Sequence, residues 1–271
     1  MSQLALDDQN SLYYLHSTPT RDSAPTFVFI NALTGTTDHW ENTVCEGLRA
    51  AGFGTLSYNF RGQDHSTFAP GTQLTPALIV EDAVRLCKEL GPSKPILVGL
   101  SIGGLFAAQA IRDGVDAAGL VYLNTLREIG PRIAWVNDSL GMFASKTGVG
   151  VMMAATFPML VNPEFLEKMK PNMLPFQIAP LPDDHPHANL MGNSNKADWA
   201  FDWASITCPV LNITGHCDRV FLDTAMVDKW CAAMSDCTRL DWDDCGHLVP
   251  LERPERLKEA LLDFGARIER A

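Results

Sequence analysis

Residues 98–104, which read Val-Gly-Leu-Ser-Ile-Gly-Gly, constrain the fold of this chain more than any other segment. A glycine lies two positions before Ser101 and another lies two positions after it, in the spacing G-x-S-x-G. An apolar run at residues 95–98 precedes the motif, and an alanine-rich stretch at residues 105–112 follows it. The pattern predicts a strand, a sharp turn and a helix in direct succession, because only small residues around the tip let strand and helix approach closely. Ser101 is expected at that tip, with its hydroxyl exposed at the helix N-terminus.

Apolar runs typical of strands alternate along the chain with stretches of helical periodicity. The predicted strands are residues 26–30, 54–58, 95–98, 118–123, 210–213 and 238–242, and the predicted helices are residues 37–51, 74–90, 105–112, 222–234 and 254–269. Residues 3–6 and 11–16 are expected to form an N-terminal hairpin, and Thr37 or Asp38 is expected to cap the first helix. This alternation predicts an α/β fold, in which a mostly parallel sheet is flanked by helices on both faces.

The interval between the strands at residues 118–123 and 210–213 is too long for a simple crossover. We expect an inserted helical cap at residues 127–204, with loops at residues 171–175 and 179–188. The core domain then consists of residues 1–126 and 205–271. The cap is expected to cover the turn at Ser101.

Two segments in the second half of the chain supply an acid and a histidine. The apolar run at residues 210–213 ends in a loop that carries Asp218, and the strand at residues 238–242 is followed by Gly246 and His247. A serine hydroxyl is a poor nucleophile unless an imidazole takes its proton, and the imidazole needs a buried carboxylate to fix its tautomer. We therefore predict a catalytic triad of Ser101 as nucleophile, His247 as general base and then acid, and Asp218 as orienting acid. Their order along the chain is that of the α/β-hydrolases.

Nearby residues compete for two of these roles. Asp241, Asp243 and Asp244 lie too close to His247 in sequence to be reached easily from the next strand end, and they are interpreted as strand-face or loop charges. His216 is the main rival for the base. It precedes the acid and is interpreted as a loop residue.

Acyl transfer also needs two N–H donors for the tetrahedral oxyanion. One donor is predicted to be the N–H of Ile102, which follows the nucleophile. The other is expected from the loop after the strand at residues 26–30, where the N–H of Leu33 is the first choice and that of Ala32 the second.

The predicted cap is rich in methionine and aromatic residues, most of which are expected to pack it onto the core. An apolar underside suits a lid over a water-consuming site, and flexible methionines adapt to irregular ligands. The residues predicted to contact substrate are Trp135, Met153, Phe157 and Arg132. A substrate with a free carboxylate would need a cation, which Arg61, Arg127 or Arg132 could supply.

Several segments resemble the 3-oxoadipate enol-lactonase-like branch of the α/β-hydrolase superfamily, and the likeness extends over nearly the whole chain. They are Asn-Ala-Leu-Thr-Gly-Thr at residues 31–36, Tyr-Asn-Phe-Arg-Gly at 58–62, Gly-Leu-Ser-Ile-Gly-Gly at 99–104, Leu-Asn-Thr at 123–125, Ile-Gly at 129–130 and Trp135. The resemblance implies the α/β-hydrolase fold and the same triad. Two departures border the site. The family's His-Gly is replaced by Gln63-Asp64, and the loop at residues 31–36 is one residue longer.

Composition narrows the partners and the compartment. The net charge of −11 argues against nucleic acid or an anionic membrane surface as a partner. The N-terminus lacks the cationic start of a signal peptide, and the seven cysteines form no C-x-x-C pair. We therefore expect free thiols and a cytoplasmic location. Whether the chain forms a homodimer is left open.

The leading functional hypothesis is a cofactor-independent serine hydrolase that cleaves a small carboxylic ester or lactone through an acyl-enzyme. The resemblance implies an enol-lactone of a dicarboxylic acid as one candidate substrate. The alternatives are a C–C bond hydrolase, a perhydrolase-type enzyme or a slow-turnover ligand receptor on the same fold. No cofactor and no metal site are predicted. His185 and His187 flank a proline in a polar segment and are interpreted as solvated loop residues.

Overall fold

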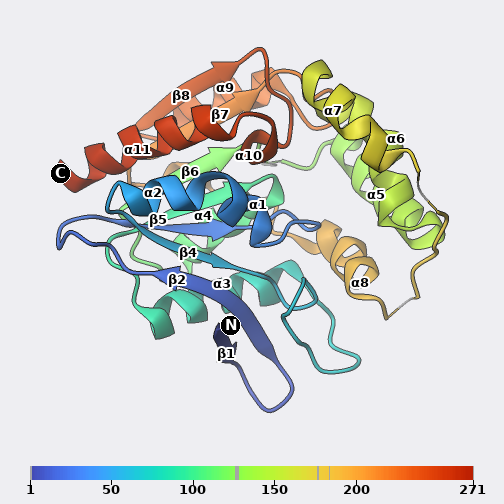
Figure 1. The fold of residues 1–271 in the computed structure, drawn as a ribbon, viewed down its shortest axis with the longest axis horizontal. Coiled ribbons are helices and arrows are strands. Elements are labelled where there is room, and N and C mark those ends of the chain that lie inside the picture. Colours follow the sequence, from blue (N-terminus) through green and yellow to red (C-terminus); the bar gives the residue numbers. More distant parts are fainter. Residues whose placement is uncertain (1, 126–127, 176, 183, 271) are drawn as a thin grey trace.

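The computed structural model describes residues 2–125, 128–175, 177–182 and 184–270, and it is built around one eight-stranded sheet (Figure 1). The strand order is β1-β2-β4-β3-β5-β6-β7-β8. Strand β2 pairs antiparallel with β1 on one side and with β4 on the other, and all the other neighbouring strands pair parallel. The strands are β1 Ser2–Ala5, β2 Ser11–Ser17, β3 Thr26–Ile30, β4 Gly54–Tyr58, β5 Pro95–Leu100, β6 Gly119–Leu123, β7 Val210–Gly215 and β8 Cys237–Trp242. This confirms the predicted α/β class.

Helices cover both faces of the sheet, since the central strands are apolar on both sides. In β3, Phe27 and Phe29 pack toward α2 (Glu46–Ala50) and α11 (Pro254–Arg270), whereas Val28 and Ile30 face the opposite layer. That layer contains α3 (Pro76–Leu90), α4 (Ile102–Arg112) and α9 (Thr224–Ala233). The short α10 (Val249–Glu252) precedes α11. Figure 1 shows α2 and α11 on one side of the sheet and α3 on the other.

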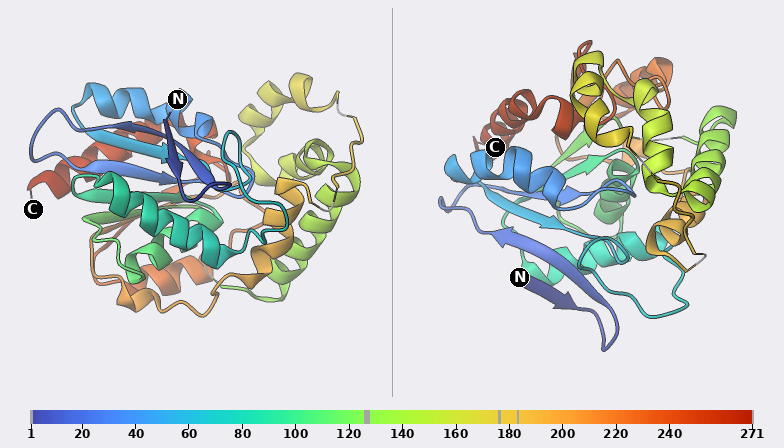
Figure 2. Two further views of the ribbon diagram at one scale, coloured as in Figure 1. Left: turned by 90° about the horizontal axis from the view of Figure 1, so that it is seen from below. Right: turned by 45° about the vertical axis from the view of Figure 1, so that its right-hand side comes forward.

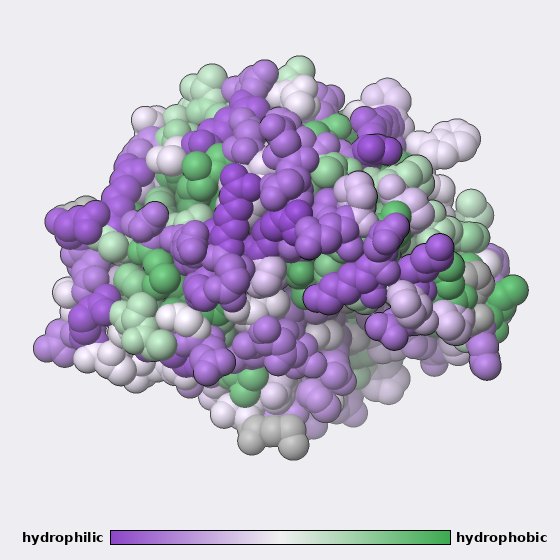
Figure 3. Space-filling view, turned by 45° about the horizontal axis from the view of Figure 1, so that its top comes forward, coloured by the Kyte–Doolittle hydropathy of each residue, from purple (hydrophilic) through white to green (hydrophobic). Residues whose placement is uncertain are grey.

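Four helices are inserted between β6 and β7, at one end of the sheet (Figure 2). They are α5 (Pro131–Thr147), α6 (Val149–Leu160), α7 (Pro163–Met173) and α8 (Pro186–Asn193), and short 3-10 turns η2 (Ser194–Lys196) and η3 (Trp203–Ser205) lead back to β7. All exposed large hydrophobic side chains among the described residues lie between Ile129 and Ile178. Figure 3 shows hydrophobic surface at its right-hand edge, the side of this insertion, on an otherwise mostly hydrophilic face. None of the helices described is both long and apolar enough to cross a membrane.

Three local predictions were wrong: the side-chain cap of the first helix and the bounds of two loops. Helix 37–51 is divided into α1 (Asp38–Trp40), a π-helical turn η1 (Glu41–Cys45) and α2, and its first turn has no side-chain cap. Thr37 itself has a helical backbone conformation. Its N–H donates to Oδ1 of Asn59 (2.8 Å), so a side chain from another segment pairs with the backbone at the start of the helix. The loop expected at residues 171–175 is partly helical, because α7 continues through Pro171 to its last turn. The loop expected at residues 179–188 ends earlier, where Pro186 begins α8.

Candidate active site

Ser101 occupies a strained turn between β5 and α4. Its backbone has φ 58° and ψ −128°, a conformation that side-chain-bearing residues rarely adopt. The turn is possible because glycines surround it: a Cβ on Gly99 would lie 2.4 Å from backbone atoms of Gly104, and a Cβ on Gly103 would lie 2.4 Å from the carbonyl oxygen of Asn31. The glycines therefore allow the strand, the helix and the end of β3 to meet at the serine.

Asp218 lies in the loop after β7 and is fully buried. Its Oδ1 accepts hydrogen bonds from the N–H groups of Val220 (3.0 Å) and Phe221 (2.9 Å). Its Oδ2 lies 2.7 Å from Nδ1 of His247. These contacts orient the carboxylate toward the imidazole and leave Nε2 of the ring available for another partner.

His247 follows β8 and is also buried, with its ring centroid 4.7 Å from that of Phe221. Ser101 and His247 line the same cavity, and Asp218 lies directly behind the imidazole. The three residues come from the carboxyl ends of β5, β7 and β8, which is where open parallel sheets place their sites.

The rivals for these roles lie elsewhere. His216 contacts Asp241 (3.3 Å) and Asp243 (3.1 Å) at the surface, and it does not line the cavity. Asp244 pairs with two arginines of the following segment, Arg253 (3.0 Å) and Arg256 (2.8 Å). These acids and this histidine are therefore engaged in contacts at the surface, away from the cavity.

The loop after β3 borders the cavity through Ala32, Leu33 and Thr34, next to Ser101 and Ile102. In the part of the chain that the structure describes, the backbone N–H groups of Ala32, Leu33 and Ile102 donate to no hydrogen-bond acceptor. The loop and the start of α4 thus border the same cavity, and each has backbone N–H groups from which no described residue accepts. This arrangement is compatible with the predicted oxyanion hole.

Gln63 holds this loop, and sequence reasoning did not identify its role. Its Nε2 donates to the carbonyl oxygens of Ala32 (2.8 Å) and Leu33 (3.2 Å). Its Oε1 accepts from Nδ2 of Asn31 (2.9 Å) and from the N–H of Phe60 (2.9 Å). The only sequence signal was that Gln63 replaces a family histidine beside the site.

Asn31 extends the same buried network. Its Nδ2 also donates to the carbonyl oxygen of Tyr58 (2.9 Å), and its Oδ1 accepts from Nε1 of Trp40 (2.7 Å). A buried polar network with its donors paired rigidifies the structure around it. The loop that carries the proposed donors is thus anchored to the ends of β3 and β4 and to α1.

Asn124 connects the loops that carry Asp218 and His247. Its Nδ2 donates to the carbonyl oxygens of Gly246 (3.1 Å) and Gly215 (3.3 Å), and its Oδ1 accepts from the N–H of Gly215 (2.7 Å). Its backbone has φ 41°, which asparagine tolerates better than most residues. In the sequence, Asn124 is distinguished only as part of the Leu-Asn-Thr segment that resembles the family.

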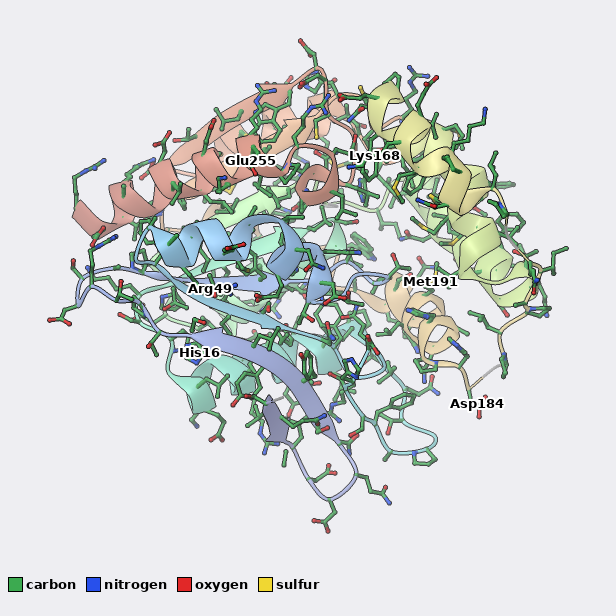
Figure 4. All side chains as sticks on the ribbon, viewed as in Figure 1. His16, Arg49, Lys168, Asp184, Met191 and Glu255 are labelled. Carbon is green, nitrogen blue, oxygen red and sulfur yellow. The ribbon has the colours of Figure 1, made fainter. Side chains whose placement is uncertain are left out.

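The cavity has a volume of about 110 Å³, and half of its lining residues come from the segment inserted between β6 and β7. Its lining residues are Ala32, Leu33, Thr34, Ser101, Ile102, Asn137, Leu140, Met152, Met153, Thr156, Leu160, Met191, Ser194, Phe221, His247 and Leu248. Figure 4 shows Met191 on α8, on the side of the insertion near the core. The surface is mostly apolar. The side-chain NH₂ of Asn137 is buried without a partner among the described residues.

Only one of the four predicted substrate contacts lines this cavity. Met153 does so, whereas Trp135 is 78% exposed on α5. Phe157 points into a separate apolar cluster, where its ring lies 6.1 Å from that of Phe165. Arg132 donates to the backbone carbonyls of residues 219 and 222. The sequence shows that this segment is rich in methionine and aromatic residues, but not which of them face the cavity and which face the interior of the insertion.

The arginines proposed as carboxylate partners are engaged elsewhere or lie outside the described residues. Arg61 makes a two-point ion pair with Asp82, at 2.8 and 2.6 Å. Burial nevertheless raises the pKa of the Asp82 carboxyl, and Arg61 opposes this shift. Arg127 is outside the residues that the structure describes. Among the described lining residues, none carries a permanent positive charge.

A family model described as the alpha/beta hydrolase family matches residues 27–260. No match is found among curated protein sequences.

Similar solved structures include a thermophilic esterase from Thermogutta terrifontis, with a TM-score of 0.80 and 21% identity over 99% of this chain and 100% of that chain. An enol-lactonase from Burkholderia xenovorans LB400 has a TM-score of 0.79 and 21% identity over 97% and 99% of the two chains. An esterase from Exiguobacterium antarcticum has a TM-score of 0.77 and 15% identity over 95% and 96%. At these identities the likeness establishes the fold. Because the family model covers most of the chain, the protein belongs to the alpha/beta hydrolase family.

Proposed function

We propose that this protein is a cofactor-independent serine hydrolase that cleaves short, uncharged carboxylic esters or lactones. The observation that carries the proposal is the 2.7 Å contact between Asp218 and His247 at the wall of a small apolar cavity that also contains Ser101. A buried carboxylate on Nδ1 prepares the other ring nitrogen to accept a proton from a serine hydroxyl.

In the proposed reaction, Oγ of Ser101 attacks the substrate carbonyl carbon while Nε2 of His247 takes the hydroxyl proton. Asp218 stabilises the imidazolium, and the N–H groups of Ile102 and Leu33 donate to the oxyanion. Collapse of the intermediate breaks the ester C–O bond, and His247 returns the proton to the departing alkoxide. Water then gives its proton to His247 and attacks the acyl-serine, so that the acid is released and Ser101 regains its proton.

The cavity favours a small acyl group without charge. An engineered apolar cavity of about 150 Å³ holds one benzene molecule, so about 110 Å³ suits an acyl group of a few carbons. A carboxylate placed here would lose water without gaining a permanent cation among the described lining residues. The dicarboxylic enol-lactone suggested by the family resemblance is therefore a weaker candidate than a neutral ester or lactone.

We further propose that residues 127–204 act as a cap. Leu140 and Met153, on α5 and α6, and Met191 on α8 contribute apolar surface to the cavity opposite Ser101. Such a cover excludes bulk water from the acyl-enzyme and strengthens the hydrogen bonds made to the oxyanion.

The test compares two p-nitrophenyl esters of similar size, the methyl-capped glutarate diester and the free hemiglutarate. The neutral ester is expected to have a kcat/KM about 100-fold higher or more, since burying an unpaired carboxylate costs several kcal/mol. Ser101→Ala is expected to lower kcat by about 10⁶-fold, as in other serine hydrolases.

Retention of turnover in Ser101→Ala would contradict the serine mechanism. Preference for the hemiglutarate would contradict the neutral substrate class, and Arg127→Ala and Arg132→Ala would then identify the responsible cation. Absence of turnover in a folded protein that reacts with a fluorophosphonate would support the alternative of a narrow substrate range or a ligand receptor.

A further inference from the structure

Glu252, at the end of α10, is a buried carboxylate whose partners lie on both sides of His247. Its Oε2 accepts from the N–H of Gly246 (2.8 Å), and its Oε1 accepts from the N–H of Leu248 (2.9 Å). These are the residues immediately before and after His247. The side chain therefore fixes the backbone through which the imidazole is positioned.

The same carboxylate also binds the inserted helical segment. Oε2 of Glu252 accepts from both the backbone N–H and the side-chain Nδ2 of Asn162, each at 2.7 Å. Asn162 is the N-cap residue of α7, where its Oδ1 accepts from the N–H of Phe165 (2.9 Å). Glu252 is thus an acceptor of four hydrogen bonds, two from each of two segments. Hydrogen bonds to an ionised acceptor are about twice as strong as neutral ones.

Further contacts join the end of α6 to both loops of the site. The N–H of His247 donates to the carbonyl oxygen of Leu160 (2.7 Å), and the N–H of Arg219, the residue after Asp218, donates to that of Met159 (2.8 Å). A Cβ on Gly246 would lie 2.3 Å from the oxygen of Leu160. The backbones are therefore in direct contact, with no room for a side chain between them.

We propose that Glu252 is a positioning residue for His247, an inference that rests on the proposed function. Through its bonds to Asn162, Glu252 also makes the position of His247 depend on the inserted segment. Residues 159–162 form a fixed attachment of this segment to the two catalytic loops. Disturbance of this attachment is expected to misplace the imidazole.

The variants follow from hydrogen-bond chemistry. In Glu252→Gln, one carboxylate oxygen becomes an NH₂ group that faces an N–H donor in either orientation, so at least one loop bond is lost. In Asn162→Asp, the oxygen acceptor that caps α7 is kept, but the donor to Glu252 becomes a second carboxylate oxygen. Asn162→Ser keeps a cap acceptor without adding charge.

For Glu252→Gln and Asn162→Asp we expect kcat on the preferred neutral ester to fall by about 10- to 100-fold, the effect of a small misplacement of a catalytic group. KM is expected to change by less than about threefold, because neither side chain lines the cavity. For Asn162→Ser we expect a kcat between that of these variants and that of the wild type. In ¹H NMR, the downfield resonance of the His247 Nδ1 proton is expected to broaden or shift in Glu252→Gln.

Leu86→Ala is the matched control, because it removes a fully buried side chain of α3 on the far layer of the core. It is expected to lower Tm without changing kcat or the Nδ1 resonance. The proposal is overturned if Glu252→Gln or Asn162→Asp lowers Tm as Leu86→Ala does but keeps kcat within about twofold and the resonance unchanged. If Glu252→Gln does not fold, Asn162→Asp decides. If the wild type does not hydrolyse esters, the resonance and the rate of fluorophosphonate labelling still test Glu252 independently of the proposed reaction.

Discussion

Gln63 supports the site through its side-chain amide, in which both the NH₂ group and the oxygen make hydrogen bonds. Its NH₂ group donates to two carbonyls of the loop after β3, and its oxygen accepts from Asn31 and Phe60. The two carbonyls belong to Ala32 and Leu33, so the orientation of the next peptide N–H groups depends on this side chain. An amide is needed here because a carboxylate could not donate and an apolar residue could do neither.

Gln63→Glu is therefore expected to reduce kcat, because the side chain keeps its size but loses its NH₂ donor. The new oxygen would face the carbonyls of Ala32 and Leu33 and repel them, which turns the proposed oxyanion donor away. Direct loss of one such donor costs about 10²–10³ in kcat, so we expect a loss of about 10- to 100-fold for this indirect change. Steady-state kinetics on the preferred ester measures it.

Gln109→Glu provides the matched control. Gln109 is a buried glutamine near the other end of α4, and its Nε2 donates to one backbone carbonyl, that of Asp198 (3.0 Å). The same chemical change there is expected to lower Tm without lowering kcat. Equal losses of kcat in the two variants would show that Gln63 has no specific effect on the site.

At the scale of elements, the turn at Ser101 depends on contact between α4 and the end of β6. A Cβ on Gly104 would lie 2.0 Å from Oγ1 of Thr125 and 2.6 Å from its Cγ2, whereas a Cβ on Gly99 would meet backbone. The obstacle at Gly104 is therefore a removable side chain, and the obstacle at Gly99 is not. Close packing of this kind transmits strain to the whole strand–turn–helix unit.

Gly104→Ala is expected to lower the free energy of unfolding by about 1–3 kcal/mol through overpacking. Thr125→Gly is expected to relieve part of this loss, giving a favourable coupling of about 1 kcal/mol in a double-mutant cycle measured by urea denaturation. Gly99→Ala combined with Thr125→Gly should show no such coupling. Additive effects of Gly104→Ala and Thr125→Gly would argue against the contact.

At the scale of the whole molecule, two half-buried histidines link folding to pH. Burial lowers the pKa of His16 and His39 below the ordinary value of about 6.5. Nε2 of His16 is buried without a partner among the described residues, so a proton there would be desolvated and unpaired. Below pH of about 6.5 the unfolded chain binds protons that the native state does not, and this difference favours unfolding.

The free energy of unfolding is accordingly expected to fall between pH 7.5 and pH 5.5, pH values chosen to bracket the unperturbed histidine pKa of about 6.5. The double variant His16→Gln, His39→Gln is expected to show a smaller fall, because glutamine does not titrate. Gln73→Ala, an exposed substitution that removes no titratable group, should leave the fall unchanged. Urea denaturation at the two pH values measures all three, and equal falls in the wild type and the double variant would contradict the assignment.

The periodicity of apolar residues in the sequence was sufficient to predict the strands and helices of the core. The strands Thr26–Ile30 and Gly54–Tyr58 match their predicted bounds, and α11 begins at the predicted proline, Pro254. Such elements are set by residues that are neighbours along the chain, through alternating burial and through residues such as Pro254 that suit only one end of a helix. The turn at Ser101 belongs with them, since small residues within a few positions allow it.

What the sequence by itself determined is therefore the α/β class, the strained turn and the order of the serine, acid and histidine segments along the chain. Only the tertiary structure decided which side chains support that site. Gln63 reaches Ala32 across 31 positions, and Asn162 reaches Glu252 across 90. Buried polar groups need hydrogen-bond partners, and these are supplied by whichever segments pack against them in the folded chain. The residues next to a polar group in the sequence do not identify those partners. For the same reason, Phe157 and Met153 have similar apolar character in sequence, but only Met153 lines the cavity.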